Sequence, residues 1–378
     1  MLLATAALLT FIFAILLVYP YIIYPRVLQY FPRKPIVTRP VNAGNGSQFS
    51  LLFCAYNEAA SLPAKIENLN KLKSQYPGIE VLAFDDGSSD GTAEMIEQGA
   101  PFVRLIKGAG RSGKARGMKT LAPLATGEYL VFTDANVLLD DNALDALAIA
   151  YTDNSVGGVC GALHYLGADG TVTASVGGLY WRIEEKIKDL ESSTGSVMGA
   201  DGSIFSIRKN LYPEFPDTVL DDFTVSMEVV FRGKRLIKDN DVVAYEKLVS
   251  ARADEFNRKI RIAARAYHTH QILRNKLRKL DKLDRFKYLS HKLIRWFGGA
   301  FFVAGALSGI TMMFAADQFS GWISIGILAA CLLIGSSNKI RVLSSAFEIL
   351  LAMFATLIGV TKAIQGKTFV TWRPAKSR

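Results

Sequence analysis

Residues 79–92 read IEVLAFDDGSSDGT, an apolar run that ends in two adjacent acids and a turn rich in Gly and Ser. The run from Ile79 to Phe84 predicts a short buried strand, and the turn predicts a helix that begins near Thr92. Open α/β sheets bind their ligands beyond the carboxyl ends of parallel strands. Asp85 and Asp86 therefore stand where such a sheet would hold a nucleotide and its metal.

The segments around this stretch alternate between expected strands and expected helices. The expected strands are 49–55, 79–84, 103–106 and 129–133, and the expected helices are 62–72, 92–97 and 115–122. This alternation predicts an α/β fold with a parallel sheet of the nucleotide-binding type, flanked by helices. The second half is more mixed, with a helix around 180–191, a small-residue segment at 195–206 and a helix after Asp222.

Apolar segments lie at both ends of the chain, which has 378 residues, 50% of them hydrophobic, and a mean hydropathy of +0.21. Residues 1–24 carry no charge and predict an uncleaved membrane anchor over 1–25. Further spans are expected within 296–364, at 296–316 and 321–336, with a weaker candidate at 342–364 because Glu348 lies in it. We expect one catalytic domain, at 48–270, between the anchors.

Basic residues after the first span, such as Arg26 and Arg33, and Lys339 and Arg341 after a later one, place those loops in the cytoplasm by the positive-inside rule. The protein is then expected in the cytoplasmic (inner) membrane, with its catalytic domain in the cytoplasm. A full crossing by 342–364 would export the basic tail 365–378, so a re-entrant or surface-lying helix is favoured there.

The formal net charge of +10 is concentrated in residues 271–295, where leucines recur at three- and four-residue spacing among Arg and Lys. This pattern predicts a basic amphipathic helix on anionic lipid headgroups and argues against nucleic acid as a partner. An ordinary solvated helix with a core face is the alternative. The three cysteines and four histidines show no metal-ligand spacing.

A glycine-rich segment at 108–114 fits two nucleotide-binding patterns incompletely. A Walker A loop needs Ser or Thr after its lysine, and Ala115 follows Lys114 here. The dinucleotide fingerprint normally opens its own domain, which would leave Asp85, Asp86 and the upstream strand and helix without a role. Both interpretations are therefore disfavoured.

Three motifs in order resemble the family 2 glycosyltransferases, and the resemblance covers most of the hydrophilic domain. They are Ala55-Tyr56-Asn57-Glu58, the segment 85–92, and Gly113-Lys114-Ala115-Arg116. The resemblance implies a GT-A-like mixed sheet, nucleotide contacts from the first two motifs, and an approach of Lys114 to the diphosphate. An acid can accept a hydrogen bond from the ring N–H of uracil, and we favour Asp86 over Asp85 for this contact.

Asp134-Ala135-Asn136 resembles the metal-binding DxD element in an altered form. Oxygen atoms of Asp134 and Asn136 can hold Mg²⁺ or Mn²⁺ against a diphosphate. Because Asn136 carries no charge, metal dependence is expected but less secure than for two acids.

Asp221-Asp222 supplies the general base in this resemblance, and we assign that role to Asp222, with Asp221 beside it. The alternative is that both acids only cap a helix over 224–231. Arg258 and Arg261 match a diphosphate-binding element of polymer-building members, but Ile262 replaces its tryptophan, which puts processive synthesis in doubt. Asp201 is expected at the acceptor site, and Trp372 in a closing segment that folds back over the active site.

These residues predict a metal-dependent inverting glycosyltransferase that uses a nucleotide sugar, with UDP favoured, and a lipid-linked or polysaccharide acceptor. A processive polysaccharide synthase is the alternative within the class. A membrane-associated P-loop-like NTPase and a sugar-nucleotide-binding subunit without catalysis are the alternatives from other classes.

Overall fold

A mixed sheet forms the centre of the hydrophilic domain in this computed structural model, which describes residues 1–166, 172–247, 252–337 and 339–371. Within these residues the sheet has eight strands in the order β3-β2-β1-β4-β7-β6-β8-β5. The strands are β1 Phe49–Ala55, β2 Glu80–Asp85, β3 Arg104–Lys107, β4 Tyr129–Asp134, β5 Leu138–Leu139, β6 Val156–Leu166, β7 Ile204–Arg208 and β8 Arg235–Lys247.

The first half of the sheet is parallel, as the alternation of strands and helices predicts. β1 pairs in parallel with both β2 and β4, so that Ala55 lies opposite Asp85, and Cys54 lies opposite Asp134. Every residue of β1 is buried, which explains why its sequence is apolar except for Ser50. The register therefore brings the acids at the ends of β2 and β4 to one edge of the sheet.

The second half of the sheet contains antiparallel pairs. β7 runs antiparallel to β4 and β6, β8 runs parallel to β6, and β5 pairs antiparallel with β8. The complete sheet is therefore mixed and flanked by helices, as the GT-A-like prediction requires.

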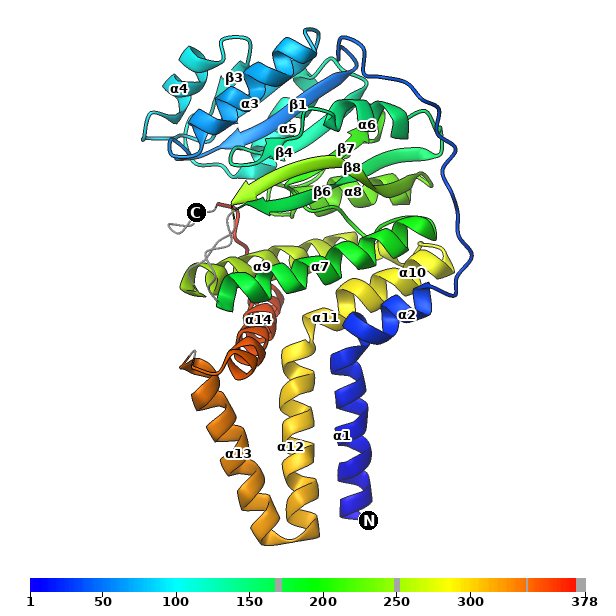
Figure 1. Cartoon of the computed structure of the whole chain (residues 1–378), viewed down its shortest axis with the longest axis vertical. Coiled ribbons are helices and arrows are strands. Elements are labelled where there is room, and N and C mark those ends of the chain that lie inside the picture. Colours follow the sequence, from blue (N-terminus) through cyan, green and yellow to red (C-terminus); the bar gives the residue numbers. More distant parts are fainter. Residues whose placement is uncertain (167–171, 248–251, 338, 372–378) are drawn as a thin grey trace.

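Helices cover both faces of the sheet. One buried apolar cluster joins it to α3 Leu62–Gln75, α4 Thr92–Gly99 and α6 Ala143–Ala150. A second cluster, on the other face, includes residues of α5 Lys114–Leu124, α8 Asp221–Phe231 and α9 Arg252–Leu277. The helix α7 Val172–Ser193 lies beside α9, between the sheet and the apolar helices (Figure 1).

Four helices of the described residues are long and apolar enough to cross a membrane. The first comprises α1 Leu2–Val18, a π-helical turn Tyr19–Ile23 and α2 Tyr24–Leu28; the others are α12 Gly298–Ala316, α13 Gln318–Ser336 and α14 Arg341–Ile364. α1, α12 and α13 extend away from the domain (Figure 1). The predicted apolar segments thus form helices with nearly the predicted bounds.

The C-terminal end of α14 lies against α9 of the hydrophilic domain. A Cβ at Gly359 would come within 2.7 Å of the Ala263 Cβ and 2.9 Å of the Ala264 nitrogen, so the glycine allows α14 and α9 to approach closely. The following residues run back toward the domain (Figure 1). Whether 342–364 crosses a membrane or lies re-entrant or on its surface stays a prediction, because α14 is also long and apolar enough to span one.

The single amphipathic helix predicted over 271–295 is divided in the structure. α9 already covers 252–277, and the chain then breaks before α10 Lys282–Tyr288, a π-helical turn Leu289–Leu293 and α11 Ile294–Trp296. Asp281 caps α10 by accepting a hydrogen bond from the Asp284 N–H, at 2.7 Å. The leucine periodicity continues across the break, but the cap starts a new helix.

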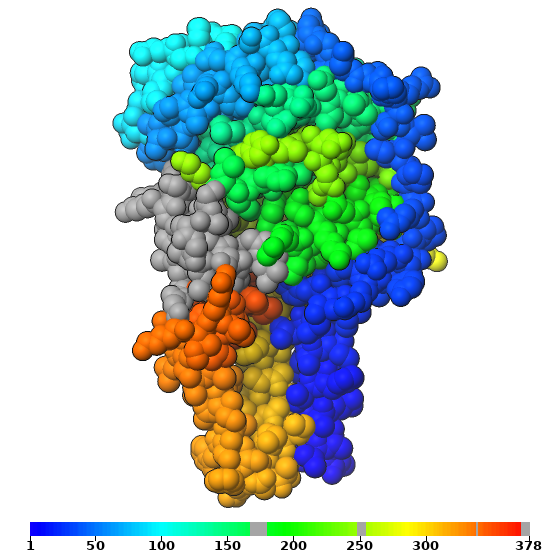
Figure 2. Space-filling view, viewed as in Figure 1, coloured from blue at the N-terminus to red at the C-terminus, as the bar shows by residue number. Residues whose placement is uncertain are grey.

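The linker between α2 and β1 lies along the flank of the domain as an extended strap, drawn in blue in Figure 2. Its Val37 N–H donates to Asp153 at 2.8 Å, and its Ala43 N–H donates to Asp145 at 2.6 Å. The strap thus connects the N-terminal helix to the far side of the sheet.

Candidate functional site

Two loops at the carboxyl ends of β1 and β2 are joined by hydrogen bonds. The Asn57 N–H donates to Ser88 Oγ at 3.0 Å, and the Glu58 N–H donates to Thr92 Oγ1 at 2.9 Å. Asp90 accepts hydrogen bonds from the Thr92 N–H and hydroxyl, which gives it a capping role at the start of α4. The first two sequence motifs therefore form one rigid surface.

Asp86 holds the glycine-rich loop. Its carboxylate accepts hydrogen bonds from the Ser112 N–H at 2.6 Å, the Ser112 hydroxyl at 2.8 Å and the Gly113 N–H at 3.0 Å. Arg111 of the same loop lies 3.7 Å from this carboxylate and stacks on the Tyr56 ring, 3.2 Å from its centroid. The Asp86 side chain is fully buried, so it serves the loop and faces away from solvent.

Asp85 keeps an acceptor oxygen available. One carboxylate oxygen accepts a long hydrogen bond from the Ser88 N–H, at 3.2 Å. The other oxygen is buried and has no hydrogen-bond partner among the described residues. Buried polar groups are nearly always paired, so this oxygen is the better candidate for a contact with a bound ligand.

Lys114, the first residue of α5, is the centre of the acidic site. Its Nζ donates to Asp134 at the end of β4 and lies 3.5 Å from the Gly202 carbonyl oxygen. A Cβ at Gly202 would lie 2.9 Å from both Lys114 Nζ and Asp222 Oδ2. Gly202 therefore leaves the space in which Lys114, Asp134 and Asp222 converge.

The charges in this site shift the pKa values of its members. Burial alone would lower the pKa of Lys114, but the nearby Asp134, Asp221 and Asp222 raise it above its usual value. Burial, and then the negative charge of Asp221, raise the pKa of Asp222 to about 7, whereas Lys114 acts in the opposite direction. A carboxylate with such a pKa is suited to accept a proton near neutral pH.

Asp221 faces a cation that the sequence analysis does not single out. Arg265 of α9 is buried, lies 3.6 Å from the Asp221 carboxylate and donates to the Val219 carbonyl oxygen. Its Nε is buried without a partner among the described residues. The two acids at the start of α8 are therefore flanked by a lysine on one side and an arginine on the other.

The candidate metal ligands are Asp134 and Asn136. The Asp134 side chain is 31% exposed, and the Asn136 amide donates to Glu246 at 2.9 Å. No group of three or more His, Cys, Asp or Glu residues that could hold a metal occurs in the described part of the chain. One carboxylate and one amide oxygen fit a Mg²⁺ or Mn²⁺ whose other ligands are diphosphate oxygens and water.

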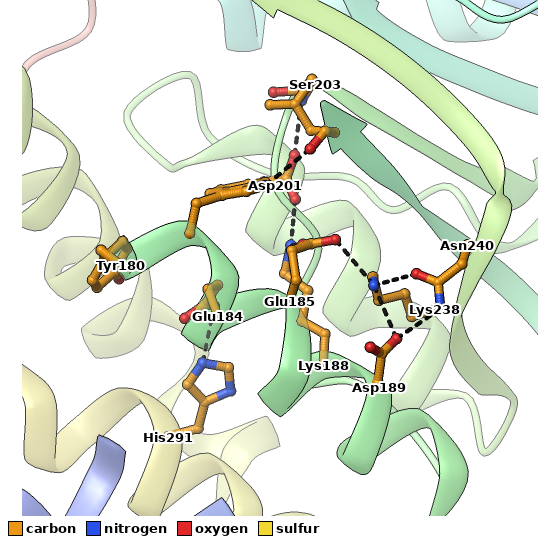
Figure 3. Close-up of polar contacts among 12 residues, drawn as sticks. Tyr180, Glu184, Glu185, Lys188, Asp189, Asp201, Ser203, Lys238, Asn240 and His291 are labelled. Atoms are coloured by element: carbon orange, nitrogen blue, oxygen red, sulfur yellow. Dashed lines mark hydrogen bonds and ion pairs between the residues drawn. The ribbon is translucent and has the colours of Figure 1, made fainter. Parts of the chain in front are cut away.

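Asp201 belongs to an ionic network on α7, which Figure 3 shows. Its carboxylate pairs with the buried Lys188 at 2.6 Å and accepts from the Ser203 N–H at 3.3 Å. Lys188 also pairs with Glu185, and Glu185 pairs with Lys238 of β8. Asp201 thus fixes the loop that carries Gly202 while its own charge is directed toward α7.

The opposite face of α7 contacts the helices that lead to the long apolar helices. One His291 ring nitrogen lies 2.9 Å from a Glu184 oxygen (Figure 3). The other lies 2.8 Å from a Glu191 oxygen, and all three side chains are buried. Glu191 also accepts from the Tyr24 hydroxyl at 2.6 Å, and Glu184 pairs with Arg295. α7 therefore connects the N-terminal helix and α11 with the loop beside Asp222.

Three further predicted residues are Arg258 and Arg261 of α9 and Trp372 near the C-terminus. Arg258 pairs with Glu255 of its own helix at 2.8 Å, and Arg261 is partly buried one turn before Arg265. Trp372 lies outside the described residues. The tail that precedes it reaches the site, because a Cβ at Gly113 would collide with the Val370 carbonyl oxygen.

Sequence reasoning missed Arg265, Glu246 and Lys188. Arg265 had a signal, since it continues the helical spacing of Arg258 and Arg261. Glu246 and Lys188 had none, because their partners are distant in the sequence and depend on how β8 and α7 pack.

Residues 50–215 match the family described as Glycosyl transferase family 2. This region includes the loops after β1, β2 and β4 and the glycine-rich loop with Lys114. The chain therefore contains a family 2 glycosyltransferase domain.

Curated relatives are similar over part of the chain. A dolichyl-phosphate beta-glucosyltransferase of Dictyostelium discoideum is 27% identical over 149 residues, which cover 35% of this chain and 45% of the relative. A poly-beta-1,6-N-acetyl-D-glucosamine synthase of Staphylococcus aureus (strain COL) is 24% identical over 225 residues, covering 57% and 53%. The matches thus span about half of each relative's length.

A solved structure is similar over nearly the whole chain. It is a mannosyltransferase from Pyrobaculum calidifontis in complex with GDP-Man and Mn²⁺, with a TM-score of 0.75, 20% identity, and coverage of 97% of this chain and 100% of that one. This likeness shows a shared fold, of the GT-A type, together with the predicted helices at both ends.

Proposed function

We propose that this chain, which carries a family 2 glycosyltransferase domain, is an inverting glycosyltransferase that uses a nucleotide sugar. The observation that supports the proposal is the convergence of Asp222, Lys114 and Asp134 around Gly202. In this reaction an acceptor hydroxyl attacks the anomeric carbon opposite the nucleotide, the bond from that carbon to the diphosphate breaks, and the nucleoside diphosphate leaves. The hydroxyl proton passes to Asp222.

Lys114 lies close to Asp222 and pairs with Asp134, and we propose that its ammonium group contacts the departing diphosphate. Its buried ammonium group can offset the negative charge that develops on the departing phosphate oxygens. When bound between Asp134 and Asn136, Mg²⁺ or Mn²⁺ would neutralise more of that charge. Asp134 would then interact with two cations, the bound metal ion and the Lys114 side chain.

For the nucleotide base we propose Asp85 as the principal contact, with the Tyr56-Asn57-Glu58 loop beside it. The sequence favoured Asp86, but three donors of the glycine-rich loop already occupy that carboxylate. The unpaired Asp85 oxygen can accept a hydrogen bond from a ring N–H, as uracil offers. Cytosine lacks such a ring N–H, so this contact favours UDP over CDP, and UDP is the proposed nucleotide.

The acceptor is proposed to be a lipid-linked sugar or a polysaccharide at the cytoplasmic face of the inner membrane. The apolar helices support this location, and α9, α10 and the turn between them expose a row of basic residues toward solvent. These residues are Arg274, Lys276, Arg278, Lys279, Lys282 and Arg285. Such a row favours anionic headgroups as neighbours.

The test is a transfer assay with the full chain in native membranes. Radiolabelled UDP- and GDP-sugars are supplied with membrane lipid extract, with and without EDTA, and the product is analysed for length and for the anomeric configuration of the new linkage. We expect transfer from a UDP-sugar that EDTA reduces, with inversion at the anomeric carbon.

Matched controls make this assay decisive. Asp222→Asn should abolish transfer, whereas Asp217→Asn, which alters an acid paired with Lys119, should not. Retained transfer in Asp222→Asn would refute the proposed base. ATP turnover that Lys114→Ala abolishes and Asp222→Asn leaves unchanged would instead indicate an NTPase.

A further inference from the structure

Asn136 is an ambiguous metal ligand, because its amide has one oxygen that can bind a cation and one NH₂ group that cannot. The orientation of the amide therefore decides whether the residue takes part in the site. This orientation matters because the described part of the chain has no group of three or more His, Cys, Asp or Glu residues that could hold a metal, so a cation at Asp134 would need the Asn136 oxygen.

Glu246 fixes the orientation of this amide. The Asn136 Nδ2 donates to Glu246 Oε1 at 2.9 Å, and Glu246 is 8% exposed. An ionised carboxylate only accepts hydrogen bonds, so it selects the NH₂ group and turns the amide oxygen away from itself. The oxygen is then available to a ligand on the other side.

The sheet holds the two residues together. Leu138 lies opposite Tyr245 and Leu139 opposite Ala244 in the antiparallel pair of β5 and β8. Continuing this register places Val137 opposite Glu246, with Asn136 at the end of the ladder. The pairing of β5 with β8 therefore keeps the backbones of Asn136 and Glu246 close to each other.

α3 holds the same turn from the other side. The buried Lys65 donates to the Val137 carbonyl oxygen at 2.6 Å, and Asn68 exchanges two hydrogen bonds with the Leu139 backbone. The backbone between Asp134 and Leu139 is thus restrained by a helix and a strand. Only the side-chain amide of Asn136 remains to be oriented.

We propose that Glu246 is a positioning residue for the divalent cation, holding the Asn136 amide so that its oxygen joins Asp134 as a ligand. Its negative charge also replaces the charge that an acid at position 136 would supply. Partners of this kind behind a metal ligand orient it and strengthen its donor oxygen. This inference rests on the metal site of the proposed function and names a residue outside the DxD-like motif.

The experiment measures Mn²⁺ binding directly. Mn²⁺ is titrated into the purified full-length protein with UDP or GDP present, and free Mn²⁺ is followed by its electron paramagnetic resonance signal. Glu246→Gln should weaken Mn²⁺ binding by about tenfold, as for other residues behind metal ligands. Glu128→Gln, which changes an exposed acid paired with Arg208, should leave it unchanged.

A swapped pair separates orientation from folding. Asn136→Asp alone places two carboxylates against each other and should bind Mn²⁺ poorly. The double variant Asn136→Asp with Glu246→Gln restores one donor and one acceptor with their positions exchanged, and should recover most of the affinity. Non-additivity of this kind identifies a direct pair.

Several outcomes would overturn the inference. They are unchanged Mn²⁺ affinity in Glu246→Gln, a lower melting temperature without a change in Mn²⁺ affinity, and a swapped pair no better than Glu246→Gln. If the parent protein binds no Mn²⁺ but still transfers sugar, this inference fails and the proposed function stands. If the parent protein binds Mn²⁺ as expected but transfers no sugar, the proposed function fails and this inference stands.

Discussion

Two pairs of adjacent aspartates, Asp85-Asp86 and Asp221-Asp222, show how burial can serve different purposes in one protein. The Asp86 carboxylate is saturated by N–H and O–H donors of the glycine-rich loop. Asp221 and Asp222 instead lie close together between the cations Arg265 and Lys114. Hydrogen-bond donors make an acid a fixed support, whereas burial, and then a neighbouring acid, raise the pKa of Asp222 and suit it to accept a proton near neutral pH.

The largest effect should come from replacing the acid that accepts the proton. Asp222→Asn removes the proton acceptor but keeps the shape of the side chain, so transfer should fall by about 10²–10⁴-fold. Binding of UDP, measured by calorimetry, should remain within a small factor of the parent. A comparable loss of UDP binding would place Asp222 in the nucleotide pocket and break the contrast between the two pairs.

Asp86→Ala should act on folding and on the donor site together. It leaves the Gly113 N–H and the Ser112 groups without their acceptor, at a cost of about 1–3 kcal/mol for each buried group left unpaired. We expect a lower melting temperature and weaker UDP binding. If the protein melts like the parent, the loop does not depend on Asp86.

Asp85→Asn should have a smaller effect that is confined to the nucleotide. A hydrogen bond to a charged group contributes about 1.5–3 kcal/mol, so UDP should bind about tenfold or more weakly, with the melting temperature almost unchanged. The affinities of the parent protein and of Asp85→Asn for UDP, CDP and GDP are compared in a competition binding assay. Equal losses for all three nucleotides would show that Asp85 does not read the base.

The smallest effect should be a change in the pH at which kcat/KM rises. Asp222 accepts a proton only when it is ionised, so kcat/KM should rise with pH through about 7. Asp221→Asn removes the negative charge that helps to raise the pKa of Asp222, and the rise should move to lower pH. If kcat/KM of Asp221→Asn rises at the same pH as in the parent protein, a group other than Asp222 controls the pH dependence.

The parallel half of the sheet could be predicted because its signals are local. β1, β2 and β4 are largely apolar runs, each ending at or followed by polar residues at the same edge of the sheet. β6 could not be found in the same way, because it contains Gly157, Gly158 and Gly161. A Cβ at Gly161 would come within 2.5 Å of the Val242 carbonyl oxygen, so close strand packing requires a residue that ordinarily indicates a loop.

The residues of the candidate site also fall into those with a local sequence signal and those without one. Lys114, Asp134 and Asp222 stand in motifs with fixed neighbours, and the structure brings them together. Arg265 and Glu246 enter the site through the packing of α9 and the register of β5 with β8, which no short sequence pattern records. The proposal of Asp85 in place of Asp86 for the nucleotide contact could not be made from the sequence, because hydrogen bonds to a distant loop decide which oxygen remains unpaired.

The contact between Val370 and Gly113 has a practical consequence for anyone who prepares the protein. The end of the described chain lies on the glycine-rich loop, whereas the N-terminus lies at the far end of α1 (Figure 1). A purification tag at the C-terminal end would be joined to a chain segment that passes the glycine-rich loop at Val370, and it would add both bulk and charge to that segment. A tag placed before Met1 avoids both.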